Sequence, residues 1–379
     1  MSINRCHNVA HFRELARKRL PAPMFHFIDG GAEDEVSLTN NTTAFDKYDL
    51  TPNYLVNVEK VDTKTTLFGK TLDWPVMLSP TGTTRLFHHS KELGVARAAA
   101  KTNTLYSVST MSTTSLEDIA AASDGLKMFQ IYILKDRSLT AEFVERCKAA
   151  KYDALCLTVD VPVGGNRERD KVSGMTVPPK FGLKSLLSFA FHPVWSLNFA
   201  LHPRFQLENV VHKAENVKGT NMMEYVNSQF DRTVTWDDAA WLAKQWNGPF
   251  VIKGLMSAED AKRARDIGAT AIMISNHGGR QMDATPGAVD CLAPMRDAIG
   301  NDLELIVDGG IRRGTHIIKA LALGANACSI GRPYLYGLAA GGQKGAERVI
   351  NLLRAEVERD MALLGCTSIA DIGPHLLGR

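Results

Sequence analysis

The chain has 379 residues, with 44 Lys and Arg against 41 Asp and Glu, a formal net charge of +3, and 45% hydrophobic residues. This composition is typical of a globular protein and excludes the strongly basic surface that nucleic-acid binding requires, so we expect no nucleic-acid partner. Six cysteines are scattered without zinc-ligand spacing, from which we expect reduced thiols, a cytoplasmic location and no metal site.

The first predicted elements lie before residue 74. Apolar residues between Leu15 and Ile28 lead into the pair Gly30-Gly31, a pattern that predicts one or two helices followed by a turn. The first 19 residues contain no continuous apolar run of the kind that signal peptides have. We expect this segment to cap the rest of the fold rather than to fold alone.

From Trp74 onward, short apolar or β-branched runs alternate with segments of helical period, which is typical of βα units and a parallel sheet. We predict eight strands, at 75–79, 105–109, 128–133, 154–159, 250–253, 271–275, 303–307 and 327–330. Helical patterns follow them, for example at 93–101, 139–149, 258–267 and 315–323. Eight such units predict a (β/α)8 TIM barrel with N-terminal capping helices, and 1–379 as a single domain. The alternative is a doubly wound sheet, but no G-x-G-x-x-G opens a helix after the early strands.

One connection breaks this rhythm. Between residues 161 and 235 no strand fits, and the segment is rich in Pro, Asn, His and Phe. A connection of this length is uncommon unless it has a function, so we interpret 161–235 as an insertion after the fourth strand, acting as a lid or a membrane-docking loop. Its most apolar part, 181–201, is interrupted by polar residues and is too polar for a membrane span.

The active site of a βα barrel lies at the carboxyl ends of its strands. Polar residues and glycines follow nearly every predicted strand here. In chain order they are Pro80-Thr81-Gly82, Ser109, Gln130 and Tyr132, Thr158 and Asp160, Lys253, Ser275-Asn276-His277, Asp308-Gly309-Gly310, and Gly331-Arg332. A barrel kept only for stability does not need charged groups at most of its strand ends, so we expect an active site there.

The ends of the last two strands predict an anion site. Gly310 and Arg312 follow the seventh strand, and Gly331 and Arg332 follow the eighth. Glycine lets backbone N–H groups approach an anion closely, and arginine can bind two phosphate oxygens at once. Because barrels commonly hold phosphate at this place, we favour a phosphate-bearing cofactor or substrate over glycines that serve only tight turns.

The sixth strand is followed by Ser-Asn-His-Gly-Gly-Arg-Gln at 275–281. His277 can exchange a proton near neutral pH, and Arg280 is a permanent cation suited to a carboxylate. We expect Asp160 to orient His277 and stabilise its protonated form, and Arg167 to supply a second cation. The alternatives are a structural histidine and a surface salt bridge between Asp160 and Arg167.

Lys253 ends the fifth strand, and its role stays open at this point. A lysine in a barrel can form a Schiff base with a substrate or act as a fixed positive charge. On the third strand, Gln130 and Tyr132 are two residues apart, so their side chains share one face.

Five segments together resemble the FMN-dependent 2-hydroxy-acid dehydrogenases and oxidases, a family that includes flavin-type lactate dehydrogenase, mandelate dehydrogenase and glycolate oxidase. They are Ser-Asn-His-Gly-Gly-Arg-Gln at 275–281, Asp-Gly-Gly-Ile-Arg-Arg-Gly at 308–314, Gln-Ile-Tyr at 130–132, Leu-Thr-Val-Asp at 157–160 and Gly-Gly-Ala-Glu-Asp-Glu at 30–35. The likeness runs through nearly the whole chain.

The resemblance implies oxidation of an L-2-hydroxy acid to the 2-oxo acid, with two electrons passing to FMN. It implies that His277, oriented by Asp160, is the catalytic base, and that Tyr132 lies near the substrate hydroxyl. It further implies that Arg280 and Arg167 bind the substrate carboxylate. Whether the base removes its proton from the α-carbon or from the hydroxyl stays open.

The resemblance also implies a set of cofactor ligands. They are Pro80, Thr81 and Gly82 beside flavin N5; Ser109, Gln130 and Thr158 at the ring; Ser275; Lys253 at N1 and O2 as a fixed charge; and Asp308, Gly310, Arg312, Gly331 and Arg332 at the ribityl chain and phosphate.

Two residues depart from the common pattern of the family. Phe25 stands where many members have a Tyr that helps to bind the carboxylate, and Met111 falls where glycolate oxidase has Trp. We therefore expect lactate, or a bulkier acid such as mandelate, as substrate. The alternative for Met111 is simple filling of a gap in the core.

The electron acceptor stays open between a quinone, a cytochrome and oxygen. Gly82 stands where oxidases tend to carry Ala, and 181–201 resembles the membrane-docking loop of the dehydrogenases. We favour a quinone-linked dehydrogenase held peripherally at the inner face of the cytoplasmic membrane, and the resemblance implies a homotetramer. The alternatives are an oxidase that produces hydrogen peroxide, and a loop that packs on its own barrel or on a neighbouring subunit. A different class, a non-redox phosphate-binding barrel such as a Schiff-base lyase or a scaffold, would show no flavin absorbance.

Overall fold

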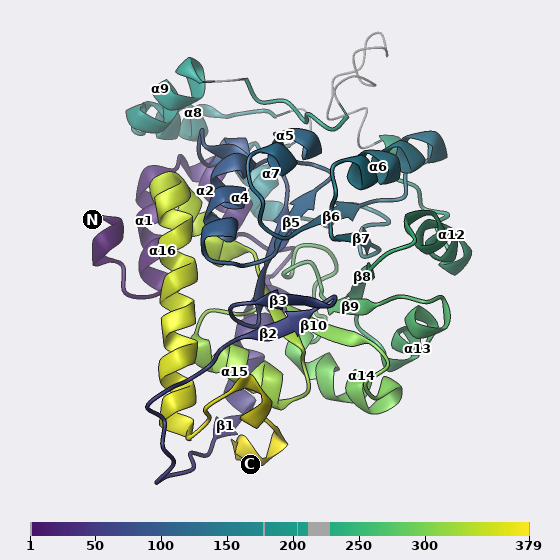
Figure 1. Cartoon of the computed structure of the whole chain (residues 1–379). Helices are drawn as coiled ribbons and strands as arrows, with labels where there is room; N and C mark the ends of the chain where they lie inside the picture. The colour runs from purple at the N-terminus through teal and green to yellow at the C-terminus, as the bar shows by residue number, and fades with distance from the viewer. Residues whose placement is uncertain (1, 177–178, 203, 211–227, 379) are drawn as a thin grey trace.

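The computed structural model describes residues 2–176, 179–202, 204–210 and 228–378, and eight of its strands close into a parallel barrel (Figure 1). The strand order around the barrel is β10-β11-β4-β5-β6-β7-β8-β9. The bounds are β4 Val76–Thr81, β5 Tyr106–Ser109, β6 Lys127–Ile131, β7 Ala154–Thr158, β8 Phe250–Leu255, β9 Ala271–Ile274, β10 Glu304–Asp308 and β11 Ala327–Ile330. All eight predicted strands are confirmed, although most of their ends differ by a residue or two.

A helix follows each barrel strand along the chain and packs around the barrel, which confirms the predicted (β/α)8 fold. These helices are α4 Lys91–Lys101, α5 Leu116–Ala121, α6 Arg137–Ala149, α12 Trp236–Trp246, α13 Ala258–Asp266, α14 Leu292–Ile299, α15 Gly314–Ala322 and α16 Arg332–Leu364. Local signals set their ends. The carboxylate of Asp136 accepts from the Ser138 N–H at the start of α6, and Gly365, with φ of 74°, ends α16.

The inward-facing side chains change from apolar to polar along the strands. On β6, Met128 precedes Gln130, and on β10, Ile306 precedes Asp308. Met128 and Ile306 belong to one buried apolar cluster inside the barrel. Because alternate residues of a strand face the same side, this order fills the amino end of the barrel with apolar atoms and collects polar groups at the carboxyl end.

A hairpin that the sequence analysis did not predict closes the amino end of the barrel. Strands β2 Thr65–Leu67 and β3 Lys70–Leu72 pair antiparallel across a turn in which Phe68 and Gly69 both have positive φ. Leu67, Phe68 and Leu72 join the same buried cluster as Met77 of β4. A further pair, β1 Asp49–Leu50 with β12 Leu377–Gly378, joins two distant parts of the chain.

The N-terminal segment forms α1 Val9–Arg19, α2 Ala22–Asp29 and α3 Val36–Thr43, one helix more than predicted. It caps the barrel as expected: α1 packs along α16 (Figure 1), and the end of α2 meets the loops at the carboxyl end of the barrel, where Arg332 Nε donates to Ile28 O at 3.0 Å. Short 3-10 turns are η1 Ile3–Arg5, η2 Ala44–Lys47, η3 Thr84–Leu86, η4 Ala288–Cys291, η5 Ile369–Asp371 and η6 Pro374–Leu376.

The connection between β7 and α12 is helical in its described parts. It contains α7 Glu168–Ser173, α8 Leu183–Ala190 and α9 Pro193–Leu201, and no named strand among residues 161–176, 179–202, 204–210 and 228–235. Residues 177–178, 203 and 211–227 of the predicted insertion lie outside the described residues. Helices α8 and α9 lie at the edge of the molecule beside α2 (Figure 1), where Ser188 Oγ accepts from the Ala22 N–H at 2.8 Å. The boundaries 161–235 stay a prediction.

Candidate active site

A buried ion pair lies at the carboxyl ends of β8 and β10. Lys253 Nζ is 3.2 Å from Asp308 Oδ2 and donates to Ser275 Oγ at 3.0 Å, and Ser79 Oγ donates to Asp308 Oδ1 at 2.6 Å. Burial lowers the pKa of Lys253, but the charges of Asp160 and Asp308 outweigh burial and raise it. An ammonium group held in this way is a poor nucleophile, so the geometry favours a fixed positive charge over a Schiff base.

His277 and Asp160 form the pair that the sequence predicts. His277 Nδ1 lies 2.9 Å from Asp160 Oδ1, and the His277 N–H donates to Ser275 Oγ at 3.0 Å. With Nδ1–H bound to the carboxylate, Nε2 is left as a proton acceptor. The His277 side chain is 29% exposed, so a small molecule can reach it from the mouth of the barrel.

The charges around the pair keep the imidazole neutral and the carboxylate ionised. Burial lowers the pKa of His277, and Lys253 and Arg280 add to this effect, although Asp160 opposes it. Burial raises the pKa of Asp160, but its contact with the His277 ring and the charge of Lys253 more than offset this and lower it. A neutral histidine beside an ionised aspartate is the protonation state that a general base needs.

Arg280 and Arg167 meet over one aromatic ring at the end of α2. The Arg280 guanidinium carbon lies 5.2 Å from the centre of the Phe27 ring, and that of Arg167 lies 5.9 Å from it. Arg280 Nη1 also donates to the carbonyl oxygens of Phe27 and Gly30. Burial, together with the charges of Arg167 and Arg332, lowers the pKa of Arg280. A buried group of like charges attracts an anion, because an anion would reduce their repulsion.

The aromatic residue at this position is Phe27, whereas the sequence predicts Phe25. The structure places the Phe25 ring 6.2 Å from the His26 ring and 5.7 Å from the Arg13 guanidinium carbon, on another side of the helix. Residues two positions apart in an α-helix, such as Phe25 and Phe27, point about 200° apart. Only one of the two phenylalanines can therefore face the arginines. The available signal was the number of positions between each phenylalanine and Gly30-Gly31, where the helix ends.

Tyr132 and Met111 border the same region. The Tyr132 ring packs edge-on against Phe230 at 5.1 Å, and burial together with Asp160 raises the pKa of its hydroxyl. Met111 lies against the end of β4: its carbonyl accepts from the Thr83 N–H at 2.9 Å, and a Cβ added to Gly82 would lie 2.7 Å from Met111 Cβ. Met111 and Tyr132 also line one small cavity.

The two predicted phosphate loops lie beside the end of α2. Arg332 donates to the carbonyl oxygens of Ile28, Gly278 and Gly30, and Arg312 Nη1 donates to Ile311 O at 2.8 Å. Burial lowers the pKa of both arginines. Gly310 has φ of 76°, and a Cβ there would lie 1.7 Å from Asn41 O, so α3 packs against this loop too tightly for any side chain. Gly331 completes the set, with Ser79 Cβ as the nearest atom to an added Cβ, at 3.6 Å.

Gln281 is a residue whose role sequence reasoning missed, although it ends the 275–281 block. Its Nε2 donates to the carbonyl oxygens of Asp160 and Val163 at 3.0 and 2.8 Å, and its Oε1 accepts from the Gly165 N–H at 3.2 Å. The amide thus fastens the backbone between Asp160 and Arg167 to the loop that carries His277 and Arg280. Its place beside two charged site residues was the available signal.

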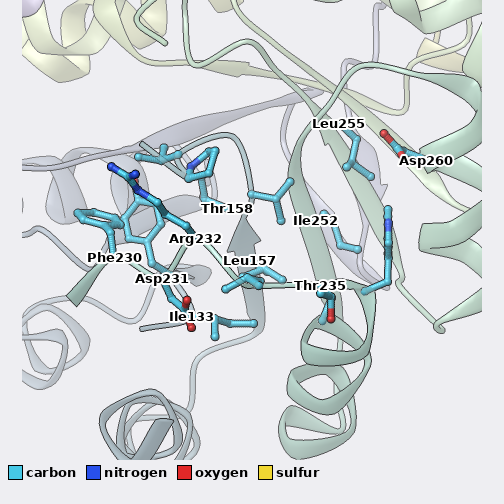
Figure 2. A pocket seen from close by; sticks show the side chains of 17 residues that line it. Ile133, Leu157, Thr158, Phe230, Asp231, Arg232, Thr235, Ile252, Leu255 and Asp260 are labelled. Atoms are coloured by element: carbon cyan, nitrogen blue, oxygen red, sulfur yellow. The ribbon is translucent and has the colours of Figure 1, made fainter. Parts of the chain in front are cut away.

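A larger cavity of about 270 Å³ lies next to this region (Figure 2). It extends between the ends of β7 and β8 and the start of α12, and it shares Tyr132 and Thr158 with the predicted site. Figure 2 shows Phe230 and Arg232 on one side of it and Ile252 and Thr235 on the other. Its lining does not include His277 or Arg280, so we do not equate this cavity with the catalytic centre.

A family model described as FMN-dependent dehydrogenase matches residues 16–379. The chain belongs to the FMN-dependent dehydrogenase family. It is 41% identical to an L-lactate oxidase of Nostoc sp. over 374 residues, which cover 98% of this chain and 97% of that protein. It is 37% identical to a peroxisomal (S)-2-hydroxy-acid oxidase of Oryza sativa subsp. japonica, over 96% and 94% of the two chains. A solved structure of monotopic (S)-mandelate dehydrogenase is similar with a TM-score of 0.94, 36% identity and 99% coverage of both chains.

FMN is the cofactor of this family, and the residues at the carboxyl ends of the strands fit it. Gln130 Nε2 and Thr158 Oγ1 are buried without a hydrogen-bond partner among the described residues, while Gln130 Oε1 accepts from Ser109 Oγ at 3.1 Å. Buried polar atoms rarely stay unpaired, and the polar edge of a flavin ring offers partners to both. Half-buried Arg312 and Arg332 suit a phosphate at the far end of the cofactor.

Proposed function

We propose that this protein oxidises an L-2-hydroxy acid, lactate or a bulkier acid such as mandelate, to the 2-oxo acid and passes the electrons to a quinone. The observation that carries the proposal is the His277–Asp160 pair at 2.9 Å, which adjoins the half-buried cations Arg280 and Arg167. A proton acceptor next to a carboxylate-binding site is what the oxidation of a hydroxy acid requires.

The two arginines would bind the substrate. Arg280 is held by two backbone carbonyls, and Arg167 lies near the same Phe27 ring. Together they would bind the carboxylate at two points and fix the α-carbon in one orientation, which is the main contribution of the protein to the rate. The Phe27 ring has no hydroxyl, so this side of the substrate receives no hydrogen bond from it.

Proton transfer falls to His277. Its neutral imidazole would take a proton at Nε2 from the α-carbon or from the hydroxyl of the acid, and Asp160 would stabilise the imidazolium that results. Tyr132, whose hydroxyl stays protonated because burial and Asp160 raise its pKa, would donate to the substrate hydroxyl oxygen.

The strand ends would hold the cofactor, as the resemblance implies. Pro80, Thr81, Gly82, Ser109, Gln130, Thr158 and Ser275 would contact the ring, with Lys253 as the fixed charge. Asp308, Gly310, Arg312, Gly331 and Arg332 would contact the ribityl chain and the phosphate. When bound, FMN supplies the two-electron oxidation that no amino-acid side chain can perform.

Helices α8 and α9 support attachment to a membrane surface. One side of α9 is fastened to the barrel, since Trp195 Nε1 donates to Leu86 O at 2.9 Å. The other side, together with α8, exposes Leu183, Leu186, Leu187, Phe191, Val194, Leu197 and Leu201. Residues 179–202 contain Lys180 and Lys184 but no Asp or Glu. A surface that is apolar with basic residues suits the interface of a membrane with anionic lipids.

The membrane proposal agrees with the likeness to monotopic mandelate dehydrogenase. No described helix has both the length and the apolar composition to cross a bilayer. We therefore propose peripheral attachment at the inner face of the cytoplasmic membrane, where a quinone would be the electron acceptor. Oxygen is the second candidate, because relatives named oxidases are 37–41% identical. We further propose a homotetramer. Exposed Tyr54 and Leu55 would supply apolar contact area between its subunits.

The test uses the purified holoenzyme. Under anaerobic conditions, glycolate, L-lactate, (S)-mandelate and longer L-2-hydroxy acids are added one at a time, and bleaching of the flavin absorbance is followed. We expect L-lactate or (S)-mandelate to bleach it fastest. A soluble quinone, or air, is then admitted, and rapid recolouring by the quinone with slow recolouring in air supports a dehydrogenase. Bound flavin that no acid bleaches would contradict the proposed reaction.

A further inference from the structure

Helix α7 carries Arg167 directly before its first residue. The helix spans only Glu168–Ser173 and ends at Gly174, which has φ of 82°. A helix of this length is not stable by itself, so contacts with its neighbours must determine its place. The position of the Arg167 guanidinium therefore depends on what holds α7.

Arg169, the second residue of α7, makes the charged contacts that fasten this helix to the N-terminal segment. Its Nε and Nη2 donate to the two carboxylate oxygens of Glu35 at 2.6 and 2.5 Å, and its Nη1 donates to Asp29 Oδ2 at 3.2 Å. A guanidinium and a carboxylate joined by two parallel hydrogen bonds form one of the strongest hydrogen-bonded contacts in proteins. The two bonds also fix the orientation of one group relative to the other.

The two carboxylates are themselves firmly placed. Asp29 is buried, and it also accepts two bonds from Arg13, at 2.6 and 2.7 Å, and one from Tyr336 at 2.8 Å. Burial raises the pKa of Asp29, but these partners lower it to about 2. Glu35 Oε1 accepts from the Gly31 N–H at 2.8 Å, so Glu35 is anchored to the glycine pair that ends α2. Arg169 thus binds two carboxylates whose positions other contacts fix.

A backbone hydrogen bond also holds Asn166, the residue before Arg167. The Glu33 N–H donates to Asn166 O at 2.9 Å, next to Arg167. The segment Gly30–Glu35 therefore meets α7 on both sides of Arg167, through Asn166 and through Arg169. This segment belongs to the block 30–35 that the sequence analysis singled out without assigning it a function.

We propose that Arg169 is a positioning residue for the substrate: through Glu35 and Asp29 it holds Arg167 where Arg167 meets the carboxylate of the hydroxy acid. The inference rests on the proposed function, because it takes Arg167 as a carboxylate ligand. Arg169 itself points away from the substrate, toward Glu35 and Asp29, so its effect reaches the substrate only through Arg167.

The test compares Arg169→Met with Arg13→Met. Arg13 binds the same Asp29 carboxylate from α1 but does not contact α7, so its variant controls for the loss of an arginine from Asp29. KM and kcat are measured with the best acid of the panel, and the Kd of oxalate, a dead-end dicarboxylate, is measured by calorimetry. In Arg169→Met we expect KM and the oxalate Kd to rise roughly tenfold while kcat and flavin content change little. In Arg13→Met we expect all of them to stay within about twofold, because Arg169 keeps both of its bonds to Glu35 and Tyr336 still holds Asp29.

A double-mutant cycle decides whether Arg169 acts through Arg167. In an Arg167→Met background, the further change Arg169→Met should have almost no additional effect on the oxalate Kd, because the group that it positions is gone. Additive effects would overturn the inference, as would an unchanged oxalate Kd in Arg169→Met or an equal rise in Arg13→Met. If Arg169→Met does not fold, Glu35→Gln, which weakens the same ion pair, must show the same rise in KM.

The failure of this inference differs from the failure of the proposed function. A wild-type protein that oxidises no acid and does not bind oxalate would remove the function, and the inference with it. A wild-type protein that is active while Arg169→Met matches it in KM and oxalate Kd would remove the inference alone.

Discussion

His277 adopts a backbone conformation that side chains other than glycine rarely have, with φ of 58°. Such a conformation costs roughly 1–2 kcal/mol and persists only where neighbours hold it. Two neighbours do so here: Ser275 Oγ accepts from the backbone N–H of His277, and Asp160 binds its ring. The turn leaves the imidazole in contact with Asp160 and 29% exposed.

Replacing His277 by Gln tests its role as the base. We expect His277→Gln to keep its flavin but to lose turnover by roughly a hundredfold to ten-thousandfold, the usual contribution of a general base. The rate of anaerobic flavin bleaching by the best acid measures the loss. The flavin absorbance per protein serves as the control for binding. If the variant bleaches at the wild-type rate, His277 is not the base.

The pH dependence of kcat/KM tests the electrostatics of the same residue. Burial, Lys253 and Arg280 lower the pKa of His277 below the ordinary value of about 6.5, and the base must be neutral. Activity should therefore be lost as the pH falls through a pKa below 6.5 and be constant above it.

Asp160→Asn gives the matching control. Asp160 raises the pKa of His277, so removing its charge should move the acid limb to still lower pH while reducing the maximal rate. An acid limb that stays in place would show that another group controls the profile.

At the scale of single residues, sequence patterns located the strand-end groups, because each follows a predicted strand directly. His277 and Asp160 are 117 positions apart in the chain, yet their pairing was predicted from the ends of two strands. Phe25 was predicted at the carboxylate-binding position, whereas the structure has Phe27 beside the two arginines, because the direction of each side chain around α2 decides this. Arg169 and Gln281 were missed because they act on other residues rather than on a ligand.

Among the elements, the contact between β4 and the loop after β5 depends on one glycine. A Cβ on Gly82 would lie 2.7 Å from Met111 Cβ and 3.0 Å from Met111 O, closer than the chain can accept without moving. The family resemblance implies that oxidases tend to carry Ala at this position. A chain with Ala there needs a different path for the loop that carries residue 111.

We therefore expect Gly82→Ala to destabilise the protein by about 1–3 kcal/mol, the usual cost of overpacking a tight contact. Thermal unfolding of the holoenzyme measures the change. Gly164→Ala is the matched control, because no atom lies within 4 Å of an added Cβ there and its φ is not positive. Equal unfolding temperatures for Gly82→Ala and wild type would show that the loop after β5 adapts freely.

The elements also show where periodicity is informative. The barrel strands have four to six residues, and the helices that follow them, apart from α5, have eight residues or more, so their pattern is clear in the sequence. The hairpin of β2 and β3 has three residues in each strand, too few for an alternation to stand out. The hairpin closes the barrel because Leu67, Phe68 and Leu72 pack against residues of strands far along the chain.

Across the whole molecule, the apolar surface of α8 and α9 contrasts with the buried core of the barrel. Phe191 and Leu201 are each 79% exposed, whereas the barrel strands are almost entirely buried. The predicted alternatives for 181–201 were a membrane surface and packing on the barrel. The described helices pack on the barrel loop through Trp195 and expose leucines on the other side, so contact with a membrane stays a proposal.

Charge placed on this surface tests the membrane proposal. We expect Phe191→Glu and Val194→Glu each to weaken binding to vesicles of phosphatidylcholine and phosphatidylglycerol by roughly tenfold, because burying such a side chain contributes about 1.5–3 kcal/mol. Leu363→Glu is the control, since Leu363 is 65% exposed on α16, away from these helices. Cosedimentation measures the binding, and a loss equal to that of Leu363→Glu would refute the docking surface.

The sequence by itself determined the barrel, the order of its units and the chemistry collected at its strand ends. It could do so because strand and helix periods are local, and because the closure of parallel strands brings their carboxyl ends together whatever the detailed packing. Only the tertiary structure decided which phenylalanine faces the arginines, how a short hairpin seals the barrel, and which side of α9 stays exposed. These features depend on side-chain direction and on contacts between segments far apart in the chain, which no local pattern encodes.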